Sequence, residues 1–378
     1  MFNKKVAVLN LGTQNLTLLC GCVEFGSVKV KAISEIEYGG YLDGEFLELD
    51  KLGGQIKDLL NNVVTTQNFN VKEIYICVPN AFCSVKIKEI FQNYDRQIRI
   101  SKKFIKELYS SGNDFSKFKT HTVINSDLIS AKTSDGEVYE FEDLINKETS
   151  SIQAQISYIF CENSFINIFN ELFKLIGIKV AGYICEGLAE VKYLLAGINN
   201  YSSCIIDVGH LSTSVIYAFN HSIVSLNEFS LGGGFITADI AEKFNISFAT
   251  AEKVKRKAIL SFLPRRNEFY EIKNNNEIMQ FSVQEVNGIV KERFRQVLKL
   301  IRKSMQINSE LLDEETNFYL TGGGFSLFRG SRDVISNSLG ASIEIIEPNV
   351  VGLDKPEYSS SLSSLFVACE KDDLGICF

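Results

Sequence analysis

The sequence contains no tryptophan, only three histidines and only four prolines among its 378 residues. The histidines His121, His210 and His221 lie far apart along the chain, so a zinc site built mainly on histidine is not expected. There is no Cys-x-x-C pair, and the Cys-x-Cys at residues 20–22 is too weak a pattern to indicate a metal site alone. A Walker A lysine loop, a Gly-x-Gly-x-x-Gly turn and a Gly-x-Ser-x-Gly elbow are also missing. The sequence therefore gives no indication of the three enzyme classes that these motifs mark.

The chain also lacks long hydrophobic runs. Its apolar stretches fall far short of the roughly 20 residues that a membrane-spanning helix needs. The first residues, MFNKK, lead directly into a strand-like segment, so we expect no signal peptide. The nine cysteines lie mostly in apolar, strand-like segments. This usage favours buried thiols in a reducing cytosol.

The net charge of −7 gives no overall basic surface that would attract nucleic acid. The charge is nevertheless uneven, because residues 251–304 hold thirteen Lys or Arg and six Glu, a local excess of +7. The rest of the chain therefore carries −14. A local excess of this kind indicates either a solvated helix face or a surface on which a partner docks.

Two parts of the chain repeat one order of elements. The first part reads as three antiparallel strands, a helix and a further strand, at residues 6–12, 15–23, 28–36, 47–64 and 71–79. A strand at 202–209 begins a second set in the same order, followed by helices at 236–260 and 282–308. Residues 82–161 change the pattern and predict a compact α+β insertion. We therefore expect an α/β fold in which two similar halves face a cleft.

The first turn that could carry chemistry follows the first strand, in the segment "NLGTQN". Such a hairpin offers backbone N–H groups to phosphate oxygens, with Gly12 allowing a close approach and Thr13 adding a hydroxyl. Asn10 can accept a hydrogen bond but brings no charge for Mg²⁺ waters. Taken alone, this turn is better explained as an ordinary hairpin.

The second hairpin, "DVGHLSTS", occupies the same place in the second half. Asp207 could orient Mg²⁺-bound water, and Ser212 and Thr213 could donate to phosphate. His210 and Leu211 stand where small residues would ease the turn, and Leu211 would crowd an approaching phosphate. His210 could donate to phosphate or could be a surface turn residue.

Two triple-glycine turns, at residues 232–234 and 322–324, each lie between a strand and an expected helix. Such turns let the backbone lie flat against a ligand and present a helix N-terminus to an anion. Glu252 and Lys255, three residues apart on one helix face, could bind ribose hydroxyls or form a solvated pair.

Together these elements resemble the actin/Hsp70/sugar-kinase superfamily and, within it, the FtsA family of bacterial actin homologues. "VLNLGTQN" is similar to the first phosphate hairpin, "CIIDVGHLSTS" to the second and "GYICEGLAEV" to the segment between halves. "LGGGFITADIAEKF" and "FYLTGGGFSL" resemble the two nucleoside segments. The resemblance implies an actin-like two-lobed ATPase fold with duplicated ribonuclease H-like halves and an FtsA-type insertion.

The resemblance also implies a division into four subdomains. Subdomain 1A would comprise residues 1–81, 162–200 and 355–378, subdomain 1C residues 82–161, subdomain 2A residues 201–234 and 305–354, and subdomain 2B residues 235–304. The cleft would hold ATP with Mg²⁺. The implied binding residues are Asn10, Gly12, Thr13, Asp207, Gly209, Ser212, Thr213, Gly232, Gly233, Glu252, Lys255, Gly322, Gly323 and Gly324, with Asp207 also positioning Mg²⁺ and water.

This chain departs from the family pattern at Asn10, His210, Leu211 and Ser214, where the family usually has an acid, two small residues and a second acid. We expect all four departures to lie on the phosphate and Mg²⁺ side, leaving the nucleoside side intact. Nucleotide binding should then be weakened, and efficient hydrolysis is not expected.

The resemblance implies a cytoplasmic protein, peripheral at the inner membrane and placed at the division site. Its partners would be the C-terminal tail of the tubulin-like protein FtsZ on residues 235–304, copies of itself and membrane proteins of the division machinery. A basic groove would suit an acidic peptide. The ending "CEKDDLGICF" is short and acidic, so strong membrane anchoring by this tail is not expected.

Two other functions remain open from sequence. One is a pilus-assembly actin homologue that binds a short peptide of a membrane protein. The other is an active ATPase or small-molecule kinase, which would need a carboxylate base beside the γ-phosphate and is disfavoured by the missing acids at residues 10 and 214.

Overall fold

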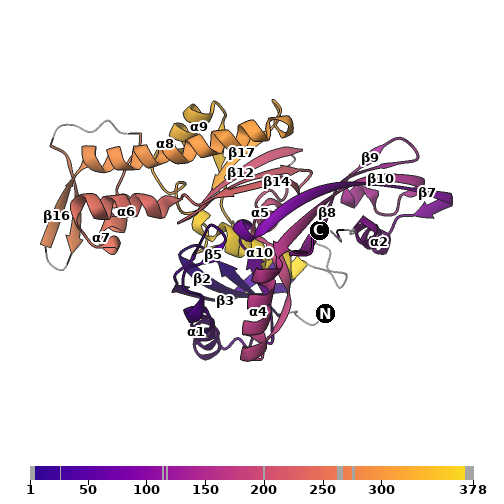
Figure 1. Ribbon diagram of the computed structural model, residues 1–378, viewed down its shortest axis with the longest axis horizontal. Helices are drawn as coiled ribbons and strands as arrows, with labels where there is room; N and C mark the ends of the chain where they lie inside the picture. The colour runs from indigo at the N-terminus through magenta and orange to yellow at the C-terminus, as the bar shows by residue number, and fades with distance from the viewer. Residues whose placement is uncertain are drawn as a thin grey trace.

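In the computed structural model, the chain forms two lobes, each built around a five-stranded sheet (Figure 1). The structure describes residues 5–370 except 26, 113–114, 116–117, 199–200, 262–266 and 275–276. Of the ending at 369–378, from which no strong membrane anchoring is expected, residues 371–378 lie outside the described residues. Among the described helices, none combines the length and apolar character needed to cross a membrane.

The sheet of the first lobe has the strand order β11-β6-β1-β2-β3. Its members are β1 (Lys5–Leu11), β2 (Asn15–Glu24), β3 (Ser27–Glu37), β6 (Glu73–Val78) and β11 (Lys179–Cys185). β1, β2 and β3 pair antiparallel, and β6 and β11 continue the sheet in parallel. Helices α1 (Leu49–Gln67) and α4 (Asn163–Ile176) pack on one face, with α5 (Glu186–Leu194) and α10 (Ser359–Glu370) on the other. Burial on both faces explains why β1 is a continuous apolar run.

The sheet of the second lobe repeats this topology. Its order is β14-β13-β12-β17-β18, formed by β12 (Ser202–Val208), β13 (Thr213–Phe219), β14 (Ser222–Phe229), β17 (Asn317–Thr321) and β18 (Ile343–Ile345). β12, β13 and β14 pair antiparallel, and β17 and β18 pair in parallel, as in the first lobe. The expected duplication of halves is confirmed. Each half presents the hairpin between its first two strands at the cleft.

The insertion forms a separate four-stranded sheet that extends away from the first lobe (Figure 1, right). It comprises β7 (Cys83–Arg99), β8 (His121–Thr133), β9 (Val138–Tyr139) and β10 (Glu148–Glu162), with helices α2 (Lys102–Gly112) and α3 (Phe141–Leu144). Phe104 N donates to Ser101 Oγ at 3.2 Å, as expected for a helix start at Ser101. β7 is long because its pairing with β10 continues to Arg99.

The far end of the second lobe is mainly helical (Figure 1, left). It contains α6 (Gly233–Phe244), α7 (Phe248–Lys255), the β15 (Phe269–Asn274) and β16 (Glu277–Ser282) hairpin, and the long helix α8 (Val283–Ile307). The Ser282 hydroxyl accepts from Glu285 N and begins α8. An apolar stripe on this helix is buried, at Val283, Val286, Val290, Val297 and Ile301.

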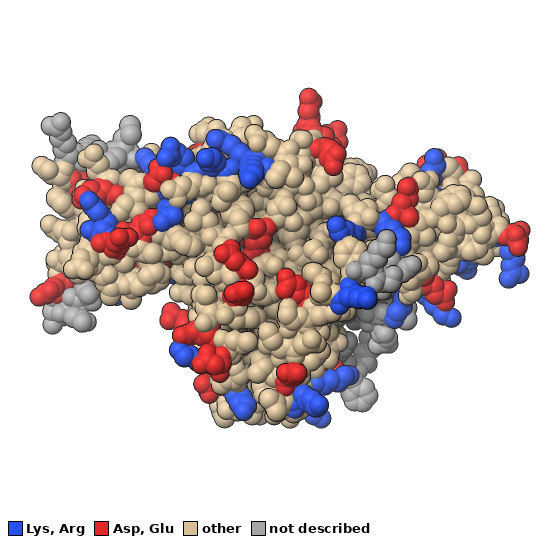
Figure 2. Space-filling view, viewed as in Figure 1, with Lys and Arg blue, Asp and Glu red and all other residues tan. Residues whose placement is uncertain are grey.

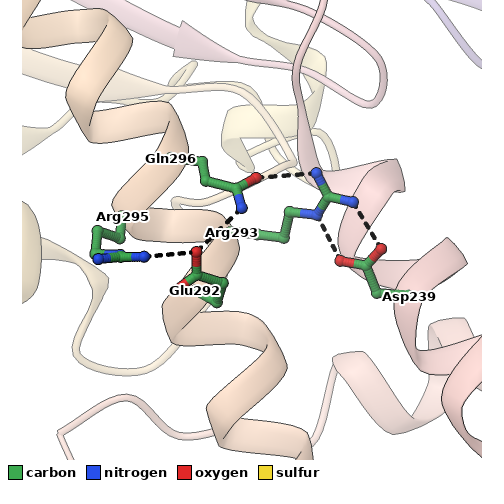
Figure 3. A network of polar contacts seen from close by, with 5 residues as sticks. All are labelled: Asp239, Glu292, Arg293, Arg295 and Gln296. Carbon is green, nitrogen blue, oxygen red and sulfur yellow. Dashed lines mark hydrogen bonds and ion pairs between the residues drawn. The ribbon is translucent and has the colours of Figure 1, made fainter.

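An ion-pair network joins α6 to α8 (Figure 3). Arg293 on α8 binds both carboxylate oxygens of Asp239 on α6, with Nη2 2.7 Å from Oδ1. Its Nη1 also donates to Gln296 at 3.0 Å. Because this two-point contact fixes both side chains, Arg293 serves the packing of these helices.

The remaining elements are β4 (Tyr41–Leu42), β5 (Glu45–Phe46) and α9 (Ser331–Leu339), with short 3₁₀ turns at Asn80–Phe82, Ser309–Leu311 and Pro356–Tyr358. The expectation of a helix directly after the glycine turn at 322–324 is wrong. That segment continues as turns to Gly330, because Phe325 and Phe328 enter the core, where Phe325 stacks on Phe294 and Phe328 packs against it edge to face.

Candidate functional site at the cleft between the lobes

A cavity of about 390 Å³ lies between the two hairpins. Residues of α5, the glycine turns and the start of α10 complete its lining. The predicted residues that line it are Asn10, Gly12, Thr13, Asp207, Gly209, Ser212, Gly233, Glu252, Lys255, Gly322, Gly323 and Gly324. The duplicated topology therefore brings together residues that are distant in the sequence.

The first hairpin, between β1 and β2, makes most of its hydrogen bonds within its own lobe. Gly12 N donates to Asn15 O at 3.0 Å. The buried side-chain amide of Asn10 donates to Cys77 Sγ at 3.3 Å and to Ser360 Oγ at 3.2 Å. Because the Asn10 amide and both of its partners are neutral, this position brings no charge to the cleft.

The second hairpin, between β12 and β13, contacts the first across the cleft. Gly209 N donates to Ser212 O at 2.9 Å and closes the turn. Leu211 N donates to Thr13 Oγ1 at 2.9 Å. The Thr13 hydroxyl, which was expected to bind phosphate, is thus bound to a backbone amide of the opposite hairpin.

Two of the residues expected to bind the nucleotide do not line the cavity. Thr213 is fully buried, and its hydroxyl donates to Leu231 O at 2.7 Å instead of facing the cavity. Gly232 precedes α6, and a β-carbon built on it would lie 2.6 Å from both Gly209 O and His210 O. Gly232 therefore allows the backbones to pack closely and does not line the cavity.

The glycine turns are packed against the second hairpin. Gly233 N donates to Gly209 O at 2.9 Å, and Gly324 N donates to Val208 O at 2.7 Å. A β-carbon built on Gly324 would lie 2.4 Å from Gly209 O, and Gly322 has a φ of 79°. The backbone needs glycine here for close approach and for positive φ. These amides, too, are already hydrogen-bonded within the protein.

The acid and the lysine expected at the ribose form a tight pair. Lys255 Nζ lies 2.6 Å from Glu252 Oε2 and donates to Gly233 O at 3.2 Å. Burial would raise the pKa of Glu252, but Lys255, Thr237 and Arg256 outweigh it, and the pKa is lowered. Burial, partly offset by Glu252, lowers the pKa of Lys255. The pair is charged and lies at the edge of the cavity.

The imidazole of His210 lies on the nucleoside side of the cleft, which corrects the expectation that all four departures face the phosphates. A β-carbon built on Gly234 would lie 2.6 Å from His210 Nε2, and the ring of Phe248 packs 5.9 Å away. Burial, with Lys255 acting in the same direction, lowers the pKa of His210 to about 4. A neutral ring therefore fills space beside the Glu252–Lys255 pair.

Three acids of this region were missed from the sequence. Glu186 and Glu190 lie one turn apart on α5, and Glu228 on β14 pairs in register with Ser214. Ser214 Oγ donates to Glu228 at 3.2 Å and accepts from Asn80 Nδ2 at 3.0 Å. A carboxyl group is therefore present beside the position where the family's second acid is replaced by serine.

The acids of the cleft hold protons more tightly than usual. Burial raises the pKa of Asp207 to about 6 and that of Glu228 to about 7. Burial, and then repulsion by Asp207, raises the pKa of both Glu186 and Glu190 well above the usual range. The four-residue spacing in "CEGLAE" could have indicated that two acids share one helix face.

These residues fit a nucleotide in part. The cavity volume lies within the range of small-molecule sites, and Glu252 and Lys255 could hold ribose. The phosphates would have to be held by Gly12, Thr13, Gly209 and Ser212, of which Thr13 already accepts a hydrogen bond from the opposite hairpin. Mg²⁺ would neutralise phosphate charge beside Asp207. Binding at the phosphate end therefore requires the hairpins to separate.

Comparison with known sequences gives one consistent result. The model of the family described as cell division protein FtsA matches residues 204–363. The FtsA of Buchnera aphidicola subsp. Baizongia pistaciae is 24% identical over 341 residues, 88% of this chain and 80% of that protein. The FtsA proteins of Staphylococcus epidermidis and Bacillus subtilis are 20% and 19% identical, and each alignment covers 97% of this chain and 79% or 84% of the relative.

Comparison with solved structures gives the same fold. The PilM–PilN type IV pilus biogenesis complex contains a chain that aligns with a TM-score of 0.64 at 16% identity, covering 97% of this chain and 98% of that one. MreB5 of Spiroplasma citri bound to ADP aligns with a TM-score of 0.55 at 12% identity, covering 96% and 95%. Combined with the duplicated lobes, these results show that the chain has an actin-like fold and is similar to FtsA cell-division proteins over most of its length.

Proposed function

We propose that this chain is a cell-division adaptor that binds the C-terminal tail of FtsZ, associates with copies of itself and binds ATP weakly, without efficient hydrolysis. The observation that carries the nucleotide part is the direct hydrogen bond from Leu211 N to Thr13 Oγ1 between the two hairpins. ATP must break this contact before its phosphates can enter. The binding energy used to open the cleft lowers the apparent affinity.

This part of the proposal is tested by titration with a fluorescent ATP analogue and Mg²⁺. The double variant His210→Gly, Leu211→Gly removes the ring beside the ribose pair and the side chain that crowds the turn. We expect weak or undetectable binding by the natural chain and clear binding by the variant. A matched control is Asn220→Gly, His221→Gly, which changes two positive-φ residues in the β13–β14 turn.

Tight binding by the natural chain would contradict the proposed weakening. If neither the natural chain nor the double variant binds, the role assigned to the second hairpin is wrong. Equal gains in the double variant and the control would mean that a general loosening of the lobe, not relief at the cleft, increased the affinity.

For the FtsZ tail we propose a basic stripe on α8, within residues 235–304. The stripe consists of the exposed cations Lys291, Arg295, Lys299, Arg302 and Lys303. Lys291, Arg295 and Lys299 follow one another at intervals of four residues and so share a helix face. Figure 2 shows blue side chains gathered along this helix. An acidic peptide would complement this charge.

Binding of a labelled FtsZ tail peptide, followed by fluorescence anisotropy, tests the stripe. Lys299→Glu reverses one charge at its centre and should weaken binding, with the loss growing at low salt. Lys57→Glu, an exposed lysine on α1, is the matched control and should leave binding unchanged. Equal effects of both variants would mean that the peptide is attracted only by the net charge of the protein. That outcome would contradict a docking site on α8.

A second candidate is a pilus-assembly actin homologue that binds a membrane-protein peptide. The alignment with the PilM–PilN complex over nearly the whole of both chains is the observation that favours it. Absence of FtsZ-tail binding together with binding of a short cytoplasmic peptide of a membrane protein would select this alternative. Of the two, the sequence relatives favour cell division.

We further propose that the protein works at the cytoplasmic face of the inner membrane at the division site, in contact with membrane proteins of the division machinery. Fluorescence microscopy of the labelled full chain in dividing cells tests this. A band at mid-cell that disappears when FtsZ is depleted is expected. Uniform fluorescence in dividing cells would contradict it.

A further inference from the structure

Two apolar side chains of the first lobe project fully into solvent. Phe25, between β2 and β3, and Val351, between β18 and α10, are completely exposed. The next most exposed large apolar side chain among the described residues, Leu175 on α4, is at 82%. Single exposed apolar residues are common on protein surfaces, so exposure alone does not indicate a function. The way in which the backbone holds these two side chains is more informative.

Phe25 occupies a turn that does not suit its residue type. Glu24 pairs with Ser27, so that only Phe25 and Gly26 connect the two strands of the hairpin. Phe25 has a φ of 52°, a left-handed conformation that a bulky side chain adopts only at a cost. Asn followed by Gly is the preferred sequence for such a turn. The phenyl ring therefore lowers the stability of the turn, and none of this loss is recovered by burial.

The turn that carries Val351 is built in a similar way. Leu353 N donates to Val350 O at 2.9 Å, and Gly352 has a φ of 80°, as in turns of type II. This geometry places Val351 at the tip of the turn. In both turns an apolar residue is thus followed in the sequence by glycine and is held away from the core.

The two turns border one groove on the first lobe. Val23 and Ser27, which flank the first tip, line this groove together with residues 349–351. Segments that are more than 300 residues apart in the sequence therefore present their apolar tips in one region of the surface. A single partner can contact both tips.

The shape and the charge of this region favour a lipid surface as that partner. A protein would need a matching pocket for each projecting side chain, whereas fluid acyl chains accept isolated apolar groups of any shape. The cations that line the groove, Lys29 and Lys31, are balanced by the acids Glu142 and Glu370. Because this balance leaves little net charge, the attraction must come mainly from the apolar tips.

We propose that the tips at Phe25 and Val351 insert into the boundary between headgroups and acyl chains of a lipid membrane. The inference rests on the proposed location at the inner membrane and goes beyond it, because no membrane protein is needed for this contact. Two side chains give only weak attachment, since even one long acyl chain anchors a protein reversibly. Several copies joined by self-association bind a membrane far more firmly than one copy does.

The absence of tryptophan allows a direct test, because one introduced indole gives a signal from a single position. Phe25→Trp keeps an apolar tip. Its emission should shift to the blue on addition of vesicles of phosphatidylethanolamine and phosphatidylglycerol, and brominated lipids should quench it. Leu175→Trp, at another exposed apolar position of the same lobe, is the matched control and should show neither change. No shift in Phe25→Trp, or equal shifts in both variants, would overturn the proposal.

A second test removes one tip and improves the turn at the same time. Phe25→Asn supplies the residue that the turn prefers, so this variant should unfold at a higher urea concentration than the natural chain. It should also bind the same vesicles about tenfold more weakly in a sedimentation assay, because one buried aromatic side chain is lost. Leu175→Gln should retain nearly full binding. Lower stability of Phe25→Asn with unchanged vesicle binding would assign the ring a structural role and overturn the proposal.

The salt dependence separates insertion of the tips from electrostatic adsorption. Because the groove charges balance, vesicle binding by the natural chain should change little between low and physiological salt. Binding that disappears at physiological salt would contradict insertion. Vesicle binding without a band at mid-cell would support the lipid contact and contradict the proposed location. A band at mid-cell without vesicle binding would retain the location and overturn the lipid contact.

Discussion

The hairpins of the two lobes occupy equivalent places in a duplicated fold, yet they are stabilised differently. In the first, Asn10 donates to Cys77 and Ser360 of its own lobe. In the second, Leu211 N reaches Thr13 in the other lobe, and Gly209 O accepts from Gly233. Apart from the contact at Thr13, the first hairpin is held within its own lobe, whereas the second is a junction on which several segments converge.

This difference shows which hairpin controls the cleft. Two of the acids with raised pKa values, Asp207 and Glu228, lie at or beside the second hairpin. The close packing of Gly232 and Gly324 is also directed at its backbone. A change in the second hairpin should thus affect stability, pH response and ligand access together, whereas a change in the first should act locally.

The largest difference in stability should appear when one glycine is replaced by alanine beside each hairpin. In Gly324→Ala the new β-carbon would lie 2.4 Å from Gly209 O, a rigid backbone atom, whereas in Gly12→Ala it would lie 3.1 Å from Asn15 O. We expect Gly324→Ala to lower the free energy of unfolding by about 3 kcal/mol, at the upper end for overpacking. Gly12→Ala should cost less.

Urea unfolding of both variants measures this, with Gly288→Ala as the control. A β-carbon on Gly288 in α8 meets open space, and alanine favours a helix, so that variant should be unchanged or slightly more stable. Equal losses for Gly324→Ala and Gly12→Ala would remove the distinction between the two hairpins.

The next effect is a pH dependence that arises at the second hairpin. The pKa of Glu228 is raised by burial from 4.5 to about 7, so the folded protein retains a proton that the unfolded chain releases. The free energy of unfolding is therefore highest below the ordinary glutamate pKa of 4.5. It falls as the pH rises from there to about 7. After allowance for partial exposure, the loss due to Glu228 should be about 2 kcal/mol.

Thermal or urea unfolding of the natural chain and of Glu228→Gln at several pH values tests this. The variant should lose less stability between mildly acidic and neutral pH. Asn10→Gln, at the equivalent neutral end of the first hairpin, should leave the slope unchanged whatever its effect on absolute stability. A natural chain with a flat profile would contradict the raised pKa.

The smallest effect concerns the hydrogen bond that joins the hairpins. Thr13→Val keeps the shape of the side chain but removes the acceptor of Leu211 N. The expected cost is about 1 kcal/mol, typical of one hydrogen bond. Thr13→Ser retains the hydroxyl and serves as the control. If Thr13→Val unfolds at the same urea concentration as Thr13→Ser, the hairpin contact contributes no stability.

Much of the fold was predictable because it depends on local pattern. The continuous apolar run of β1 and the stripe at Val286 and Val290 of α8 identify a buried strand and an amphipathic helix without knowledge of their partners. The repeated order of strands then gave the duplication. The helix expected after residues 322–324 failed because Phe325 and Phe328 are drawn into a core that local pattern does not reveal.

The site was predictable only in outline. The sequence identified glycine turns and hairpins because their residue types are themselves signals. It could not show that Thr213 faces Leu231, or that His210 crosses to the nucleoside side, because both outcomes depend on packing between distant segments. Glu190 was missed because an acid in a helix is ordinary until its burial and lack of a partner are seen.

By itself, then, the sequence determined two α/β halves, the insertion within the first of them and the turns at which a ligand could bind. Strand and helix periodicity and glycine usage are local properties, and the sequence records them directly. Only the tertiary structure decided that the two hairpins bind each other and that three acids share the cleft floor. Those facts depend on which surfaces the packed lobes bring together and on the water they exclude.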